Sequence, residues 1–153
     1  MTYLALKLVH IFAVMAFLGN IAAGLFWQAR AQRTGDPKII AHTLAAIIAS
    51  DRLVTVPSVV LILITGVATA LMGGFPIFST DWIFWTLVLF IVSGVLFMAF
   101  VVPLQRQMLI YALSGAFDPP VYTSLALRWR LWGLLALATP LAGVVLMVLK
   151  PAW

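Results

Sequence analysis

The sequence predicts an all-α, polytopic membrane protein that forms a single four-helix bundle over residues 1–153. Composition is the first observation: 65% of the residues are hydrophobic and only 8% are charged, whereas about a quarter of a soluble domain is charged. The second is the spacing of charge. Four runs without Asp, Glu, Lys or Arg reach the roughly 20 residues of a transmembrane helix, namely 8–29, 53–80, 82–105 and 131–149. This composition excludes a water-soluble domain, a disordered chain and a nucleic-acid-binding protein.

The four expected spans cover residues 4–29, 52–73, 82–105 and 129–149, and helix-ending residues support their limits. At the boundaries of the second, third and fourth spans, the sequence contains glycine, proline or an N-capping residue. These signals are Gly73-Gly74 after the second span, Ser79, Thr80 or Asp81 before the third, Asp118-Pro119 before the fourth, and Lys150-Pro151 after it.

Residues 37–50 precede the second span and are not expected to cross the membrane. Asp36 followed by Pro37 is typical of a helix start, with an acidic N-cap before a proline in the first turn. Ile40, Leu44 and Ile47 then recur at helical spacing. We expect a short cytoplasmic helical extension of the second span, or a separate helix on the membrane surface.

The tryptophans cluster near the expected ends of the spans. Amphipathic rings collect at membrane–water interfaces, so we expect them to anchor the bundle there rather than to stack on a cofactor. They are Trp82, Trp85, Trp129, Trp132 and Trp153. The chain contains no cysteine, which excludes disulfides, thiolate metal sites and cysteine nucleophiles.

Two polar residues stand out in the first span, because polar groups inside a membrane are costly. His10 shares a helix face with Lys7, which lies one turn nearer the chain start, and Asn20 lies deeper. A neutral imidazole there can ligate haem iron or a metal, or relay a proton. The alternative is a histidine that only hydrogen-bonds two helices together.

Helix two carries a polar stripe at helical spacing, formed by Asp51, Thr55, Ser58, Thr65 and Thr69. We expect this stripe to face the bundle interior. It is suited to interhelical packing, to lining a hydrated groove, or to binding propionates and head groups. Arg52 stands beside Asp51, which favours a structural ion pair over an anion-binding role. Pro57 should bend the same helix.

The sequence lacks the residues that several classes of catalytic and metal-binding site require. No second buried acid or base accompanies His10, which excludes hydrolytic triads and carboxylate pairs. One histidine is too few for a metal site made only of protein ligands, but a tetrapyrrole brings four nitrogens of its own. His42 is expected on the opposite side of the membrane, so it should not share one iron with His10 within a protomer.

The chain resembles small four-helix bacterial inner-membrane proteins of unknown function over nearly its whole length. The matching segments are Tyr3-Leu4-Ala5-Leu6-Lys7-Leu8-Val9-His10, Asp51-Arg52-Leu53 with Pro57, Thr65-Gly66, Val102-Pro103 with Gln105 and Arg106, and Leu146-Met147-Val148 with Lys150-Pro151. Those proteins are in turn similar to the oxygen-independent, haem-binding protoporphyrinogen oxidases and to the membrane domain of copper-resistance proteins of the D type.

The resemblance to the oxidases implies a haem b cofactor, with His10 matching the histidine implicated in haem binding. If the protein is an enzyme, the resemblance implies an oxidoreductase of the protoporphyrinogen oxidase type. The sequence departs from the oxidases in the first and third spans, and the third span also lacks the histidine that they carry within it. Residues 26–30 lack their second histidine, and Trp82 and Trp85 open the third span where they carry a lysine.

Three functions follow as expectations. The first is a haem-b-binding, redox-related inner-membrane protein, active in electron transfer or porphyrin-linked oxidation, with His10, Lys7 and Asn20 at the cofactor. The second is a cofactor-free membrane subunit or scaffold that packs against a partner subunit or a second copy. The third is a small-molecule or copper-ion permeation unit that uses the stripe of helix two.

The charges also predict the orientation in the membrane. All of the nine Lys and Arg residues except Lys7 and Lys150 lie in or beside the first and third connections. Cytoplasmic loops carry such an excess of basic residues, so we expect these two connections in the cytoplasm and both termini outside it.

Cysteine labelling tests this orientation, and the natural chain contributes no background cysteine. In intact cells, an impermeant thiol reagent should label Phe75→Cys and leave Arg33→Cys unmodified until the membrane is permeabilised. Labelling of Arg33→Cys together with protection of Phe75→Cys would reverse the predicted topology.

Overall fold

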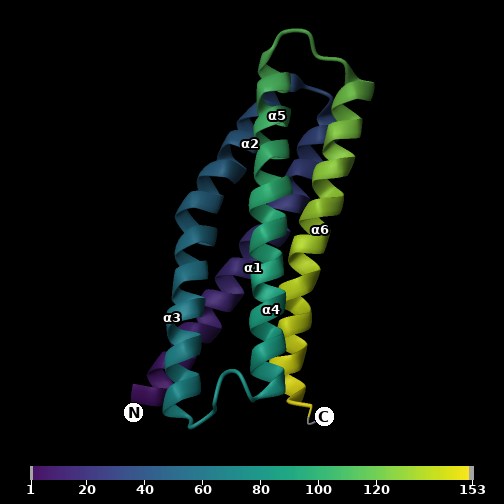
Figure 1. Ribbon diagram of the computed structural model, residues 1–153. Helices are drawn as coiled ribbons and strands as arrows, with labels where there is room; N and C mark the ends of the chain where they lie inside the picture. The colour runs from purple at the N-terminus through teal and green to yellow at the C-terminus, as the bar shows by residue number, and fades with distance from the viewer. Residues whose placement is uncertain (1, 152–153) are drawn as a thin grey trace.

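The computed structural model describes residues 2–151, which form four long antiparallel helices (Figure 1). The predicted all-helical membrane fold is confirmed, because each helix is long and apolar enough to cross a membrane. Both chain ends lie at the lower end of the bundle in Figure 1, and the first and third connections lie at the upper end. In chain order, the elements are α1 (Thr2–Thr34), α2 (Pro37–Ser50), η1 (Asp51–Thr55), α3 (Val56–Met72), α4 (Asp81–Leu96), η2 (Phe97–Val101), α5 (Val102–Leu113) and α6 (Pro119–Leu149).

The helices extend beyond the predicted spans, most of all toward the first and third connections. A helix satisfies its backbone hydrogen bonds internally whether or not lipid surrounds it, so hydropathy marks the membrane and not the end of the helix. The segment 37–50 is continuous with the second span, within one long helix from Pro37 to Met72. It is therefore an extension of that span and not a separate surface helix.

The helix ends largely follow the predicted signals. Asp36 is the N-cap of α2, and its carboxylate accepts a hydrogen bond of 2.8 Å from the backbone N–H of Lys38. Thr80 is the N-cap residue of α4 and Asp118 that of α6, although neither side chain makes a capping hydrogen bond. Lys150 ends α6 in the left-handed conformation, with φ of 44°.

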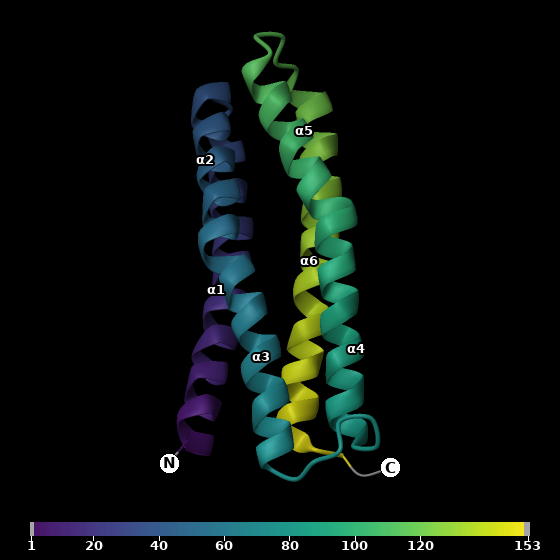
Figure 2. The ribbon, with the colours of Figure 1, turned by 60° about the vertical axis from the view of Figure 1, so that its left-hand side comes forward.

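Two of the long helices contain a π-helical turn directly before a Val-Pro pair. The N–H of Val56 donates to the carbonyl of Asp51, and the N–H of Val102 donates to the carbonyl of Phe97, each five residues back. Pro57 and Pro103 follow, and a proline has no N–H and crowds the preceding turn. The wider π turn accommodates each proline, and α2 passes into α3 with a visible bend in Figure 2.

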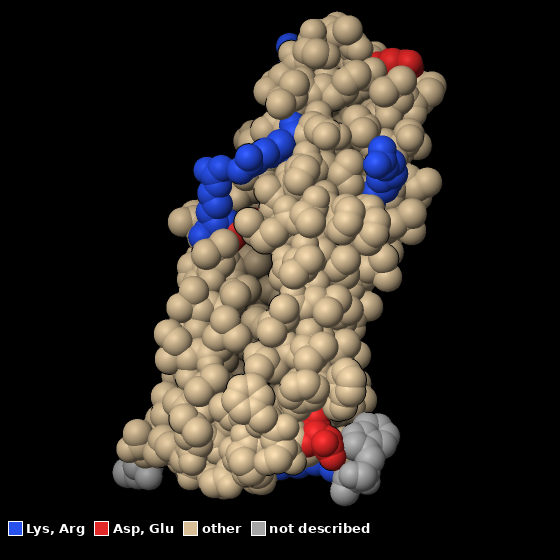
Figure 3. All heavy atoms as spheres, in the orientation of Figure 1, with Lys and Arg blue, Asp and Glu red and all other residues tan. Residues whose placement is uncertain are grey.

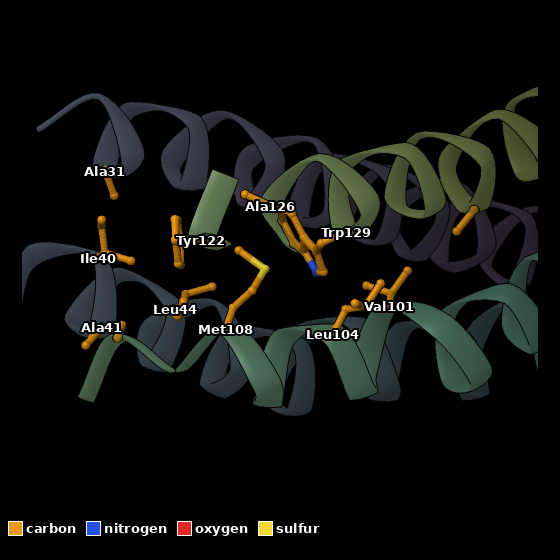
Figure 4. Close-up of a cluster of buried hydrophobic side chains, with 12 residues drawn as sticks. Ala31, Ile40, Ala41, Leu44, Val101, Leu104, Met108, Tyr122, Ala126 and Trp129 are labelled. Carbon is orange, nitrogen blue, oxygen red and sulfur yellow. The ribbon is translucent and has the colours of Figure 1, made fainter. Parts of the chain in front are cut away.

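The interior forms two apolar clusters, one in each half of the bundle. Near the first and third connections, α2, α5 and α6 meet through Leu44, Met108, Tyr122 and other residues (Figure 4). Toward the chain ends, α1 packs on α3 through a smaller cluster that includes Phe17 and Ile62. The buried residues of α6 alternate at spacings of four and three: Tyr122, Ala126, Trp129, Gly133, Ala136, Pro140 and Gly143.

One tryptophan does not lie where the sequence placed it. Trp129 is only 2% exposed and belongs to the apolar cluster near the first and third connections, called the upper cluster below. It is therefore not an interfacial anchor. Trp85 is half exposed, and Trp132 stacks on Phe100 with 4.0 Å between ring centroids. The amine of Lys150 lies over the ring of Trp82. Trp153 lies outside the described residues.

The surface shows where the bilayer fits. In Figure 3, charged side chains occur in the upper part and at the lower end, with a broad uncharged belt between them. The helix from Arg52 to Met72 covers about 30 Å at 1.5 Å per residue, which matches the hydrocarbon thickness of a bilayer. Asp51 and Arg52 therefore mark one edge of the belt, and the helices continue past it.

Packing in the upper cluster should contribute strongly to stability. Met108 is fully buried, whereas Met98 is 67% exposed on the outer surface. We expect Met108→Ala to lower the free energy of unfolding in detergent by about 2–5 kcal/mol, because it removes buried side-chain volume. Met98→Ala is the matched control and should change it by less than about 0.5 kcal/mol. Equal losses in the two variants would show that this cluster is not a packed core.

Candidate functional site

A hydrogen-bonded polar cluster surrounds the carboxylate of Asp51, at the first residue of the π turn η1. Asn20 Nδ2 donates to Asp51 Oδ1 at 3.3 Å, and the hydroxyl of Thr55 donates to the same oxygen at 3.1 Å. Gln105 Nε2, from α5, donates to Asp51 Oδ2 at 2.9 Å. One buried carboxylate thus joins three of the four long helices.

Asn20 is fully engaged in this cluster. Its amide nitrogen also donates to Thr55 Oγ1 at 2.9 Å, and its amide oxygen accepts from the hydroxyl of Ser50 at 2.5 Å. Asn20 follows His10 by ten residues, a rise of about 15 Å along α1. The structure therefore places Asn20 in the Asp51 cluster, apart from the hydrogen bonds of His10, and the role of Asn20 at a cofactor stays a prediction.

The carboxylate of Asp51 is held by amides and a hydroxyl, in contrast to the ion pair expected with Arg52. Asp51 is 8% exposed, whereas the Arg52 side chain is exposed on the outer surface. The Arg52 side chain leaves the helix about 100° away from that of Asp51, and here it points outward. The partners of Asp51 are Thr55, one turn further along its own helix, and Asn20 and Gln105 from helices that pack against it.

The rest of the helix-two stripe also faces inward. Thr55, Ser58 and Thr65 are buried, and Thr69 is half-buried. The Thr65 hydroxyl donates to the carbonyl of Leu61, and that of Thr69 donates to the carbonyls of Thr65 and Gly66. Because these hydroxyls bond to their own helix, the lower part of the stripe is suited to helix packing.

A cavity of about 20 Å³ lies beside the Asp51 cluster, and residues of all four long helices line it. It has room for a single water molecule. Trp129 lines it, and within residues 2–151 its indole Nε1 has no hydrogen-bond partner on the protein. The residues from the two π turns that line the cavity are Asp51, Phe97 and Val101. Figure 4 shows the indole nitrogen turned toward the segment that carries Val101 and Leu104.

His10 forms a separate site, between α1 and α3. Its Nδ1 lies 3.1 Å from the carbonyl oxygen of Ile62 and 3.1 Å from Thr65 Oγ1. A carbonyl oxygen can only accept, so Nδ1 carries the hydrogen in the neutral imidazole and Nε2 keeps its lone pair. Gly66 makes this approach possible, because a Cβ at that position would lie 3.0 Å from His10 Cε1.

Two further residues considered in the sequence analysis, Lys7 and His42, lie at very different distances from His10. Lys7 precedes His10 by one turn of α1, and its side chain is exposed. His42 lies beside Trp27, since both line one groove, and Trp27 is about 25 Å beyond His10 along α1. The two histidines therefore cannot bind one iron within a protomer, in agreement with the sequence prediction.

The sequence analysis did not predict two residues of this region: Gln105, which bonds Asp51, and Trp129, which lines the neighbouring cavity. Gln105 follows the last apolar residue of its run and precedes Arg106, where it resembled an ordinary boundary residue. Trp129 was assigned to the interface because it stands at the expected start of the fourth span, residues 129–149. The alternating four-three spacing along α6 was the available signal, since it places Trp129 on the same inward face as Gly133 and Ala136.

These features define the class of the protein: a four-helix integral membrane protein with a buried carboxylate cluster and a separate intramembrane histidine. Residues 4–151 match the family DUF2269, described as a predicted integral membrane protein, and the chain belongs to this family. No curated protein matches the chain significantly, and no solved structure does.

Removing the central carboxylate should destabilise the bundle. Asp51→Ala leaves the buried donors of Asn20 and Gln105 without their acceptor, at about 1–3 kcal/mol for each group. We expect the free energy of unfolding in detergent to fall by about 2–4 kcal/mol. Asp118→Ala serves as the control, since that exposed side chain makes no capping bond. A similar small effect of both substitutions would contradict a structural role for the cluster.

Proposed function

We propose that the protein binds haem b through His10 and acts as a redox-related membrane protein. The observation that supports this most is the state of the imidazole. Its Nδ1 is bonded to the Ile62 carbonyl and the Thr65 hydroxyl, and this leaves Nε2 as the iron-binding atom. Metal-ligating histidines commonly donate their other N–H to a carbonyl, which fixes the ring and strengthens it as a ligand.

The donor set around His10 fits a porphyrin better than a bare metal ion. Within residues 2–151, no group of three or more His, Cys, Asp or Glu lies close enough together to hold a metal. A porphyrin supplies four nitrogens itself and needs only an axial ligand from the protein. Bound haem b would supply a one-electron redox centre.

The neighbouring residues have distinct roles in this proposal. Lys7, exposed one turn from His10, is placed to pair with a propionate, since charge-assisted bonds to carboxylates are strong. Apolar residues around Phe17 and Ile62 keep water from the inner side of the imidazole. Because His42 lies far from His10, a second axial ligand would come from a partner subunit or a second copy.

A second candidate function is a cofactor-free membrane subunit. The same two hydrogen bonds of His10 join α1 to α3, and Gly66 packs against the ring. These contacts would stabilise the bundle without any cofactor. The two functions differ in whether the Nε2 atom of His10 binds iron.

Haem reconstitution of purified protein separates the two candidates. We expect a Soret band in the wild type that is lost in His10→Ala and retained in the control His42→Ala. Added imidazole should restore the band in His10→Ala, because it replaces the missing ligand in the vacated space. An equal band in wild type and His10→Ala, or no band in either, would overturn haem ligation by His10 and favour the cofactor-free subunit.

A further inference from the structure

A buried indole N–H faces the small cavity beside the Asp51 cluster. Trp129 is 2% exposed and lines the cavity, and over residues 2–151 its Nε1 has no hydrogen-bond partner on the protein. Figure 4 shows this nitrogen turned toward the segment that carries Val101, which lines the same cavity. A buried donor without an acceptor costs free energy, so the indole needs an acceptor inside the cavity.

The carboxylate of Asp51 also lines the cavity, and it has an acceptor position to spare. Asn20 and Thr55 donate to Oδ1, and Gln105 donates to Oδ2. Three donors facing one carboxyl group fit its ionised form, which only accepts hydrogen bonds and has about four lone-pair sites. One site on Oδ2 is therefore open to a further donor. Asn20 supplies none, because its amide nitrogen already donates to Asp51 and to Thr55.

These two groups require an occupant that accepts on one side and donates on the other. The indole of Trp129 only donates, and the ionised carboxylate of Asp51 only accepts. A metal cation would lie against the positive end of the indole N–H bond, and an anion would lie against the carboxylate. A water molecule has both lone pairs and hydrogens, so it satisfies the two groups together.

The size of the cavity also selects water. Its volume is about 20 Å³, and a bound water needs about 10–15 Å³ together with at least two polar partners. An organic ligand is too large, and two waters would need more space than the cavity offers. Most of the other residues that line it are apolar, which holds the water at the side where Trp129 and Asp51 meet the cavity.

We propose that one water molecule is bound in this cavity, where it accepts a hydrogen bond from Trp129 Nε1 and donates one to Asp51 Oδ2. The direct hydrogen bonds of Asp51 come from its own helix, from α1 and from α5. The water adds α6, which carries Trp129. It thereby completes a polar layer that joins all four long helices at the level of the two π turns.

A surface groove gives this water a route for exchange. The groove, of about 380 Å³, opens between α1 and α2. Asn20, Gly24 and Ile47 line both the groove and the cavity, and thus form the wall between them. Gly24 contributes no side chain to this wall, so the barrier between the bound water and the groove is thin.

NMR of the indole groups tests the water site in detergent-solubilised protein labelled with ¹⁵N-tryptophan. The chain has six tryptophans, and Trp129→Phe assigns the Trp129 signal. We expect this signal to show a rotating-frame Overhauser cross peak to water, opposite in sign to the diagonal, which distinguishes a bound water from hydrogen exchange. Val101→Ile adds a methylene, about the size of a water molecule, to the cavity wall. It should abolish the cross peak and move the indole proton upfield. Val95→Ile is the matched control on α4, where Val95 is 58% exposed, and should change neither.

Three outcomes would overturn the water site. A Trp129 signal without a water cross peak in the wild type is the first, and it decides the matter even if Val101→Ile does not fold. An equal cross peak in Val101→Ile and Val95→Ile is the second, because the water would then lie elsewhere. The third is a shift of the wild-type Trp129 signal when sodium chloride is replaced by choline chloride, which would indicate a cation. No haem is added, so none of these outcomes depends on haem binding by His10.

Discussion

The structure depends on the need to satisfy one carboxylate inside an apolar bundle. A charged or polar group withdrawn from water costs free energy unless it is hydrogen-bonded, and a four-helix membrane bundle has few donors to offer. Asp51 obtains them from α1, from its own helix and from α5. Because these donors come from different helices, they fix the vertical register of three helices against one another, which apolar packing alone specifies weakly.

The two π turns occur at this same level of the bundle. Asp51 begins the first, and Phe97 and Val101 bound the second, so both irregular turns line the one small cavity. A straight α-helix at either place would rotate every residue beyond the turn by about 100°. The π turns thus let the helices present one inward face below the cluster and another in the extension above it. They divide the bundle into a membrane half, with His10, and an upper half, with the groove.

Much of the fold follows from the sequence, because lipid imposes strict rules on composition and on backbone hydrogen bonding. The number of helices, the N-cap at Asp36 and the inward direction of Thr55, Ser58 and Thr65 are all readable from spacing. Pairings between helices are not. Nothing in the spacing of Asn20 shows that it bonds Asp51 rather than lying at the cofactor, and Gln105 reaches Asp51 across 54 positions of chain. Hydropathy also began the fourth helix too late, at residue 129 instead of Pro119, because Arg128 and Arg130 hide the regular burial pattern around Trp129.

The account of His10 can be tested without any cofactor, by nitrogen NMR of protein labelled with ¹⁵N-histidine. The chain has only two histidines, and a His42→Gln variant assigns the two sets of signals. The structure predicts that the neutral His10 ring carries its hydrogen on Nδ1, in a bond to the Ile62 carbonyl, and leaves Nε2 free to bind iron. A ring protonated on Nε2 instead would contradict the geometry on which the proposed function rests.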